Sequence, residues 1–296
     1  MEIKKKLTLL ALVIFTGCTS NPFWSDNPSK KINIQGYVFK QDSVSNVPVF
    51  VFVEHLGVST NTDENGFYSI DLPNLEMENG NFSGSVKIYY YIHNYKVFHS
   101  TVYITNGRLT SAQTDFDENG ALLEPVRLEK IMSLNISIDS FWNRSSADTL
   151  KFSLDLVSHD HPVSFHSYVD VLSNPRRYVP SGLLLQSIQN KSVYYDENGV
   201  DFVQVTDMEV NQNIQLNYEI AANGFLPFII DNYISLDEQL VQNGLHVILP
   251  YIFIIQEDVP EEIYYLMGLQ LQSIESISVD YLKIPIDIVS KTIFIQ

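Results

Sequence analysis

The chain has 296 residues, of which 45% are hydrophobic, and its formal net charge is −17 at pH 7. This composition excludes an intrinsically disordered chain, and the length suffices for one large or two ordinary domains. The excess of acidic residues repels phosphate groups and so argues against nucleic-acid binding. The single cysteine excludes an intramolecular disulfide.

The N-terminal segment has the pattern of a secretory signal. Lys4–Lys6 are basic, and the apolar run Leu7–Phe15 is shorter than the roughly 20 residues that span a bilayer. The lipobox-like Phe15-Thr16-Gly17-Cys18 follows, and the segment resembles a bacterial lipoprotein signal. The resemblance implies that residues 1–17 are removed and that Cys18 receives diacylglycerol and a further acyl chain such as palmitate. The alternative is an ordinary secretory signal with an incidental cysteine.

Residues 18–31 are rich in Pro, Ser, Asn and Lys and predict a lipidated tether. In Gram-negative lipoproteins an Asp directly after the cysteine is the usual signal for retention in the inner membrane, but this chain has Thr19 there. The resemblance therefore implies a lipid-anchored protein of the cell envelope, most simply at the outer membrane. We expect its partners to be the membrane, through the anchor, and another envelope protein.

From Ile32 onward, short apolar runs between turn signals predict antiparallel strands. One face of such a strand carries Val47, Val49, Val51 and Val53, and the other carries Phe50 and Phe52. A strand that is apolar on both faces is covered on both. We expect one of these faces to meet the core of its own β-sandwich and the other to meet a second domain.

Residues 32–131 resemble the carboxypeptidase regulatory-like family, a transthyretin-like β-sandwich. The resemblance rests on Gly36-Tyr37-Val38, Val47–Val51, Thr62–Ile70 and Leu72-Pro73. His93-Asn94 replaces a Gly that the family often has. In that family the domain is an accessory to a zinc peptidase, and no His of this chain has the Glu three residues on that the zinc signature needs. The resemblance thus implies a fold and not catalysis.

Residues 132–296 predict a second β-sandwich domain. Apolar and polar residues alternate over 134–138, 152–156 and 214–220, as in half-buried strands. The nearly apolar run Leu245–Ile255 predicts a central strand that is interrupted at Pro250. Alternation over 277–288 predicts the closing strands. A helix is predicted over 260–272, with Asp258 as its cap. The expected fold is all-β, with two Ig-like or transthyretin-like antiparallel sandwiches and one short helix near the C-terminus.

One loop has half of a calcium-binding pattern. Asp115, Asp117 and Asn119 occupy positions one, three and five, and Gly120 occupies position six. Position twelve holds Val126 instead of the bidentate Glu, so calcium would bind weakly. The alternative is a polar hairpin loop, because Asp-Glu-Asn-Gly recurs at 63–66, 117–120 and 196–199 and is typical of hairpin turns.

Three other clusters have two interpretations each. His159, His161 and His166 could hold a transition metal, or they lie in a solvated loop. A ligand-binding surface could be lined by Tyr89–Tyr91, or these tyrosines form cross-strand pairs within a sheet. Such a surface could also include Arg176–Tyr178, or the two arginines neutralise nearby carboxylates.

The sequence contains no phosphate-binding glycine loop, nucleophile elbow or metalloprotease helix. We therefore expect no catalytic residues and no cofactor apart from the weak calcium possibility. The predicted function is a non-enzymatic structural or protein-interaction module at the outer membrane. The alternative is a glycan- or peptide-binding lipoprotein with an exposed aromatic groove, and a third possibility is a hydrolase built on a β-sandwich.

Overall fold

The computed structural model confirms an all-β fold with one short helix near the C-terminus, α2 (Glu261–Leu266), within the part of the chain that it describes. No helix in that part is long and apolar enough to cross a membrane. The structure describes residues 32–296 except 42–45, 74–75, 78–79, 111–113, 144–148, 160, 174–175, 182, 192, 198–200, 205–213, 221–227, 236–240, 251 and 270–278. Cys18 and the predicted tether lie outside the described residues.

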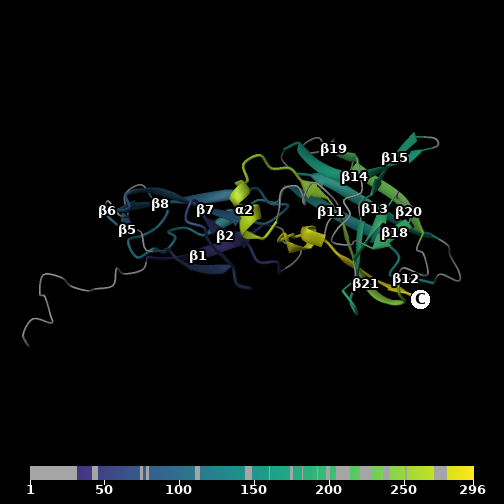
Figure 1. Ribbon diagram of the computed structural model, residues 1–296, viewed down its shortest axis with the longest axis horizontal. Coiled ribbons are helices and arrows are strands. Elements are labelled where there is room, and N and C mark those ends of the chain that lie inside the picture. The colour runs from purple at the N-terminus through teal and green to yellow at the C-terminus, as the bar shows by residue number, and fades with distance from the viewer. Residues whose placement is uncertain are drawn as a thin grey trace, which may run out of the picture.

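The N-terminal half contains two facing sheets (Figure 1). In the smaller sheet, β1 lies between β4, which is antiparallel to it, and β10, which is parallel. The larger sheet has the order β3-β2-β7-β8-β9, and a separate hairpin joins β5 to β6. The bounds are β1 (Asn33–Lys40), β2 (Phe50–Val53), β3 (Val58–Asn61), β4 (Phe67–Asp71), β5 (Glu76–Met77), β6 (Gly80–Asn81), β7 (Gly84–Tyr91), β8 (Phe98–Thr105), β9 (Arg108–Thr110) and β10 (Val126–Leu128).

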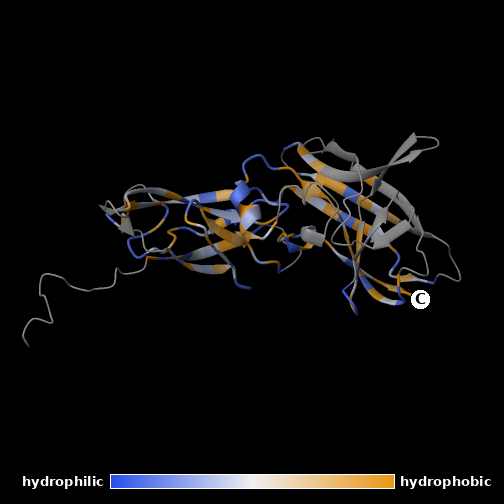
Figure 2. Ribbon diagram, in the orientation of Figure 1, coloured by the Kyte–Doolittle hydropathy of each residue, from blue (hydrophilic) through white to orange (hydrophobic). Residues whose placement is uncertain are grey.

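These two sheets enclose one apolar core and form a β-sandwich. Ile34 and Val126 from the smaller sheet pack in the same buried cluster as Val51, Ile88 and Ile104 from the larger one. Hydrophobic and hydrophilic residues alternate along the strands (Figure 2), as expected where one face of a strand meets a core.

The C-terminal half also contains two sheets. The larger has the order β11-β13-β20-β18-β17-β16-β21-β23-β12, and the smaller has β15-β14-β19 with β22 paired to β14. The bounds are β11 (Met132–Ile138), β12 (Phe141–Trp142), β13 (Thr149–Ser158), β14 (Val163–Ser173), β15 (Arg176–Ser181), β16 (Leu183–Ser187), β17 (Val193–Glu197), β18 (Asp201–Gln204), β19 (Ile214–Ile220), β20 (Phe228–Ser235), β21 (Gly244–Pro250), β22 (Phe253–Ile254) and β23 (Lys291–Ile295).

The nine-stranded sheet curls round on itself. Its two edge strands are β11, which ends at Ile138, and β12, which begins at Phe141. Only two residues separate them, and an extended chain spans at most about 3.6 Å per residue. The two edges must therefore lie close together, and the curled sheet encloses a core that includes Ile136, Leu154, Ile248 and Ile293.

The last part of the chain corrects two predictions. Residues 279–283 form a 3-10 helix, η1 (Val279–Lys283), and the last strand is β23. The closing strands predicted over 277–288 are therefore wrong for the described residues, 279–288. The helix predicted over 260–272 ends at Leu266, with Gly268 at φ +74 just beyond it. Its N-cap is Pro260 instead of Asp258, without a side-chain cap bond.

The chain also changes sheet near Pro250. The predicted central strand over Leu245–Ile255 is divided: β21 pairs with β16 and β23, whereas β22 joins the smaller sheet through β14. Proline lacks the N–H that a continuing ladder needs, so the strand ends there.

The two faces of β2 lie as predicted. Val51 and Val53 pack in the core of the N-terminal sandwich. Phe50 and Phe52 pack instead with Tyr281, Ile284 and other apolar residues of the C-terminal half. In Figure 1, α2 lies over β2 and β7, and the yellow η1 lies between the two groups of sheets. Residues of both helices pack against this phenylalanine face.

Candidate functional site

The loop predicted to bind calcium is held by its own backbone. Asp117 Oδ1 accepts hydrogen bonds from the backbone N–H groups of Ala121 (2.8 Å) and Asn119 (2.9 Å), which lower the pKa of this carboxyl, the Ala121 bond most. Asp115 Oδ2 accepts a bond from Thr101 N–H at 2.7 Å. The described residues contain no cluster of three or more His, Cys, Asp or Glu suited to a metal ion. The calcium site stays a prediction, and the loop geometry is explained without a cation.

The Asp-Glu-Asn-Gly turns at 63–66 and 117–120 have the same hydrogen-bond pattern and contact β1 near its two ends. In the first turn, Asp63 Oδ1 accepts bonds from the N–H groups of Asn65 (2.9 Å) and Phe67 (2.8 Å), the same spacing as in the Asp117 turn. Gly66 O accepts a bond from Val38 N–H of β1 at 2.8 Å. The turn is not a hairpin, because β3 and β4 belong to different sheets.

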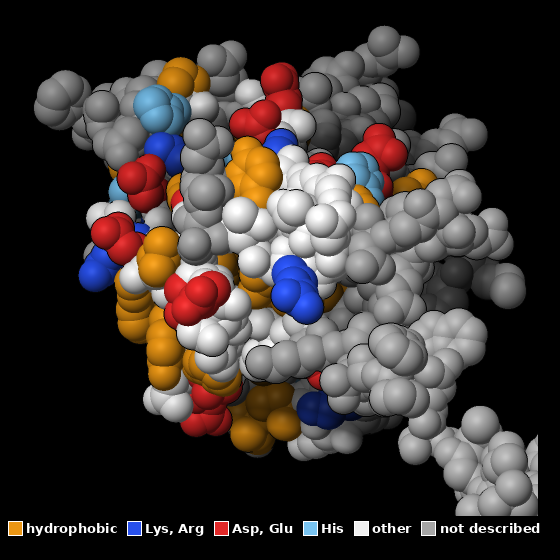
Figure 3. All heavy atoms as spheres, turned by 90° about the vertical axis from the view of Figure 1, so that its left-hand side faces the viewer, with side chains coloured by type: hydrophobic (Ala, Val, Ile, Leu, Met, Phe, Trp, Pro, Cys, Tyr) orange, Lys and Arg blue, Asp and Glu red, His pale blue; other side chains and the backbone are white. Residues whose placement is uncertain are grey.

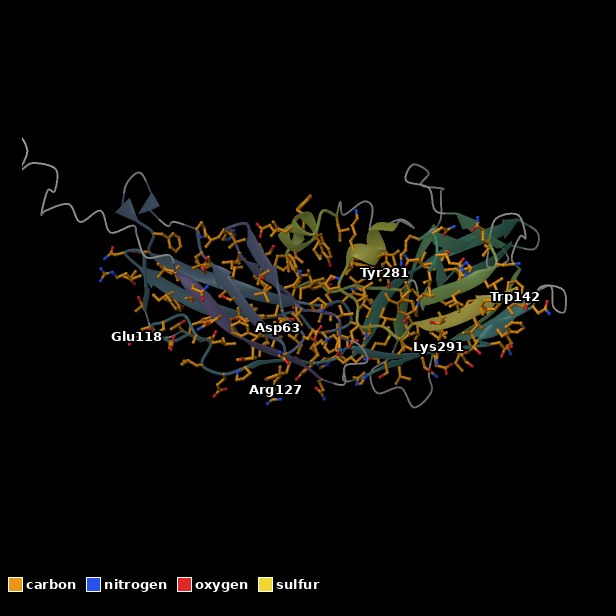
Figure 4. All side chains as sticks on the ribbon, turned by 90° about the horizontal axis from the view of Figure 1, so that it is seen from below. Asp63, Glu118, Arg127, Trp142, Tyr281 and Lys291 are labelled. Atoms are coloured by element: carbon orange, nitrogen blue, oxygen red, sulfur yellow. The ribbon has the colours of Figure 1, made fainter. Side chains whose placement is uncertain are left out.

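The second turn is a hairpin and is closed by an antiparallel bridge between Phe116 and Leu122. Gly120 O accepts a bond from Gln35 N–H of β1 at 2.9 Å. Glu118 projects from this turn at the end of the N-terminal half away from the C-terminal half (Figure 4). The third copy joins β17 to β18, which are antiparallel, and residues 198–200 of it lie outside the described residues.

The tyrosine triplet Tyr89–Tyr91 is buried and does not form an exposed ligand groove. All three side chains are at most 7% exposed. The hydroxyls of Tyr68 and Tyr90 lie 2.8 Å apart. Burial raises the pKa of both groups, that of Tyr90 to about 12, so both hydroxyls stay protonated. The interpretation as cross-strand pairs is supported by the register of Tyr91 with Phe50.

The histidine cluster does not form a ligand set in the described residues. His159 lies beyond the end of β13, and its Nε2 is 2.8 Å from Ser133 Oγ. His161 is exposed in the following bend, where its carbonyl accepts a bond from Ser158 Oγ. His166 lies within β14, and the side chains of His166 and of Arg176–Tyr178 are outside the described set.

The connection between the halves is held by Asn94. This residue has φ +72, so it adopts the left-handed conformation at the place where the resembled family often has Gly. Its side-chain amide donates to Met132 O (2.8 Å) and its amide oxygen accepts from Met132 N–H (3.0 Å). Ile131 N–H donates to Asn94 O at 3.0 Å. Residues 129–131, which join β10 to β11, are thus fixed on residues 94–96.

His93 brings the C-terminal half onto the N-terminal sandwich. The imidazole ring is completely buried and stacks on the ring of Phe253, with 5.0 Å between the two centroids. Its Nε2 accepts a hydrogen bond from the backbone N–H of Ile254 at 3.1 Å. Its Nδ1 lies 3.3 Å from Tyr91 Oη. Burial is the main cause that lowers the pKa of His93 to about 4. The ring is therefore neutral at pH 7 and acts as a hydrogen-bonding bridge between the halves.

A second buried polar contact lies at the same junction. Asp287 of the C-terminal half is completely buried. Its Oδ2 accepts a bond from Tyr95 Oη at 2.5 Å and lies 3.9 Å from Lys130 Nζ. In the sequence, Asp287 is a lone acidic residue within the apolar run Ile284–Ile288, and the alternation of this run predicts a strand and not a buried polar contact.

Beside these contacts the structure has a cleft of about 710 Å³ between the two halves. Apolar side chains from both halves line it, including Val47, Phe50, Leu249, Met267, Leu282 and Ile286. Its polar described lining residues are Asn61, Gln186, Tyr281 and Lys283, and none is acidic. No sequence signal identified this cleft, because its walls come from segments far apart in the chain.

The comparisons with known proteins give no family. No family model and no curated protein matches this chain. Among solved structures, a DUF3823 family protein from Bacteroides ovatus ATCC 8483 aligns with 77% of this chain and 91% of its own, at 11% sequence identity and a TM-score of 0.28. A similarity of this size supports no conclusion about function. The carboxypeptidase regulatory-like assignment therefore stays a proposal.

Proposed function

We propose that this chain is a non-catalytic lipoprotein of the outer membrane that holds a protein partner away from the lipid surface. The N-terminal sandwich, which we assign to the carboxypeptidase regulatory-like type, acts as a spacer. The C-terminal half carries the interaction surface. Cys18 provides the anchor, and residues 18–31 provide the tether.

The observation that supports this proposal is the direction of β1. Asn33 lies beside Gly120 at the end of the molecule away from the junction. At the other end of β1, Lys40 is followed by Gln41, whose carbonyl oxygen lies 3.0 Å from the Tyr95 hydroxyl that contacts Asp287. A strand of eight residues spans about 26 Å. A chain tethered before Ile32 therefore displays its C-terminal half at least one strand length from the tether. Figure 3 looks onto the end of the molecule that carries β5 and β6 in Figure 1, where charged side chains of both signs are spread among apolar ones.

The C-terminal half carries an exposed apolar row that suits protein contact. Phe141, Phe294 and Leu245 lie in register across three neighbouring strands and are each about 40–50% exposed. The rings of Phe141 and Phe294 stack with centroids 6.0 Å apart. Ile188 continues the row, because its N–H donates to Leu245 O at 3.0 Å. Exposed apolar side chains of this kind are common in protein–protein interfaces.

In-cell photo-cross-linking tests the proposal. A photoreactive amino acid at position 141 or 294 should capture one dominant envelope protein in the native host, identified by mass spectrometry. The matched control carries the same group at position 118, at the opposite end of the molecule (Figure 4). Capture from 118 but not from 141 or 294 would contradict the assignment of the surface, and capture of nothing from any position would contradict the interaction role.

Fractionation tests the anchor separately. The native protein should sediment with outer membranes, and Cys18→Ala should not be processed to a lipidated form. An unchanged membrane fraction and mobility for Cys18→Ala would contradict lipid attachment.

The glycan- or peptide-binding alternative loses one of its two sites. It required an exposed aromatic groove at Tyr89–Tyr91 or at Arg176–Tyr178, and the first of these is buried. Turnover of a peptide or glycan by the purified protein would contradict the non-catalytic proposal and favour the hydrolase possibility.

A further inference from the structure

The cleft between the two halves has the size and the lining of a small-molecule site. Its volume of about 710 Å³ lies within the roughly 300–1,000 Å³ that is typical of ligand pockets. Leu249, Met267, Leu282 and Ile286 are only partly buried and contribute apolar surface to its walls. Such side chains gain most from an apolar ligand, because each still exposes surface to water.

The charge of the cleft differs from that of the chain. The chain has 35 acidic and 18 basic residues, yet the described lining residues of the cleft include one lysine, Lys283, and no acid. Lys283 is exposed, whereas its neighbours Tyr281 and Ile284 are buried. The amides of Asn61 and Gln186 add neutral hydrogen-bonding groups. The cleft thus favours a ligand with an apolar body and a single anionic group.

We propose that this cleft binds a small amphipathic carboxylate of the fatty-acid type, with its chain against the apolar walls and its carboxylate near Lys283. The proposal is independent of the partner-binding function, because the cleft and the apolar row of the C-terminal half are different surfaces. Tyr281, which lines the cleft, lies between the two halves in Figure 4, while Lys291 lies within the C-terminal half.

Calorimetric titration with saturated carboxylates tests the apolar part of the proposal. The protein is the mature chain, residues 18–296, carrying Cys18→Ser so that no detergent is needed. Decanoate should bind with one site per chain. Affinity should rise about fourfold for each methylene added from octanoate to decanoate, the ratio expected for complete burial of each methylene. The absence of saturable binding by either carboxylate would overturn the proposal.

Replacement of Asn61 by Trp places a large ring in the cleft and should abolish binding. The control is Ser59→Trp, on the same strand but outside the lining, which should bind like the unmodified protein. Equal loss in both variants, or retention in both, would overturn the assignment of the ligand to this cleft. Thermal unfolding of each variant verifies that it is folded.

The anionic part is tested with decanol, which has the same chain without the carboxylate. The native protein should prefer decanoate to decanol by roughly two- to fivefold, the range of an exposed ion pair. Lys283→Gln should remove this preference, and Lys291→Gln should retain it. A preference that survives in Lys283→Gln would overturn the role of Lys283.

Discussion

The left-handed backbone of Asn94 and the two bonds of its side chain hold the connection between the halves. Both bonds are made to Met132, the first residue of β11. Asn94→Gly keeps the conformation but loses both bonds, and should lower the free energy of unfolding by about 1–3 kcal/mol. Asn94→Ala should cost roughly 1–2 kcal/mol more, because alanine is strained at φ +72. Urea unfolding measures both values.

Asn106 provides the control for Asn94, because it also has a positive φ, of +50, but lies in an exposed turn. Asn106→Gly should change the free energy of unfolding by less than Asn94→Gly does. Equal effects at the two positions would show that the Met132 bonds contribute nothing measurable.

The neutral ring of His93 should make stability depend on pH. Its pKa is about 4 in the folded protein and about 6.5 in the unfolded chain. The unfolded chain therefore binds more protons between these values, and the stability that His93 contributes is complete above pH 6.5 and is lost as the pH falls toward 4. The loss amounts to about 3 kcal/mol.

The comparison variant is His93→Gln, which removes the titrating group. The difference in unfolding free energy between the native protein and this variant should be constant above pH 7 and decrease between pH 6.5 and 4. Urea unfolding at several pH values measures it, and a difference that does not vary with pH would contradict the assigned role of the ring.

At the scale of elements, the paired turns around β1 depend on their glycines. A Cβ at Gly66 would lie 2.3 Å from Val38 O, and one at Gly120 would lie 2.0 Å from Asn33 O, so the turn could not approach the strand. Both residues have φ above +75°. Gly66→Ala and Gly120→Ala should each destabilise the protein by roughly 3 kcal/mol.

Gly57 provides a control that separates the cost of a positive φ from the cost of a clash between the new Cβ and a neighbouring strand. It has φ +63, but a Cβ there would meet nothing within 4 Å. Gly57→Ala should therefore cost only about 1 kcal/mol, the strain of the backbone. If all three variants have the same melting temperature, the close approach of the turns to β1 is not important for stability.

The sequence was informative for those elements whose apolar residues alternate over a buried face. The alternation of buried apolar residues with polar ones in β11 and β13 was predicted correctly, and so was the burial of both faces of β2. The segment 277–288 was not. Ile284, Ile286 and Ile288 alternate as in a strand, but among its described residues, 279–288, the pairing is a single bridge from Ile286 to His93. Its packing on the N-terminal sandwich decides its conformation, and periodicity within one segment does not contain that information.

The candidate sites were less predictable than the strands for the same reason. Asp117 fits a calcium pattern and a turn pattern equally well in sequence, and only the bonds to Asn119 and Ala121 show the second role. The cleft could not be predicted, because Val47 and Leu249 line it together although they lie about two hundred residues apart in the chain.

At the scale of the whole molecule, the halves share buried contacts that should make them unfold together. Phe50 and Phe52 pack with residues of the C-terminal half, and Asp287 is buried against Tyr95 and Lys130. In differential scanning calorimetry we expect one transition, with the calorimetric enthalpy equal to the van't Hoff enthalpy. Two transitions in the native protein would show that the junction contributes little to stability.

Asp287→Ala should weaken this coupling. The substitution leaves Lys130 buried beside Tyr95 without the carboxylate, and loss of one partner of a buried charged pair typically costs about 3–5 kcal/mol. Because the lost contact lies at the junction, the two halves should no longer unfold together. The single calorimetric transition should therefore separate into two transitions, one for each half. Asp71→Ala, which removes an exposed carboxylate bonded to Asn33, should keep one transition. Since a spacer can hold a partner at a fixed distance only if its junction is rigid, the same variant should also reduce photo-cross-linking from position 141.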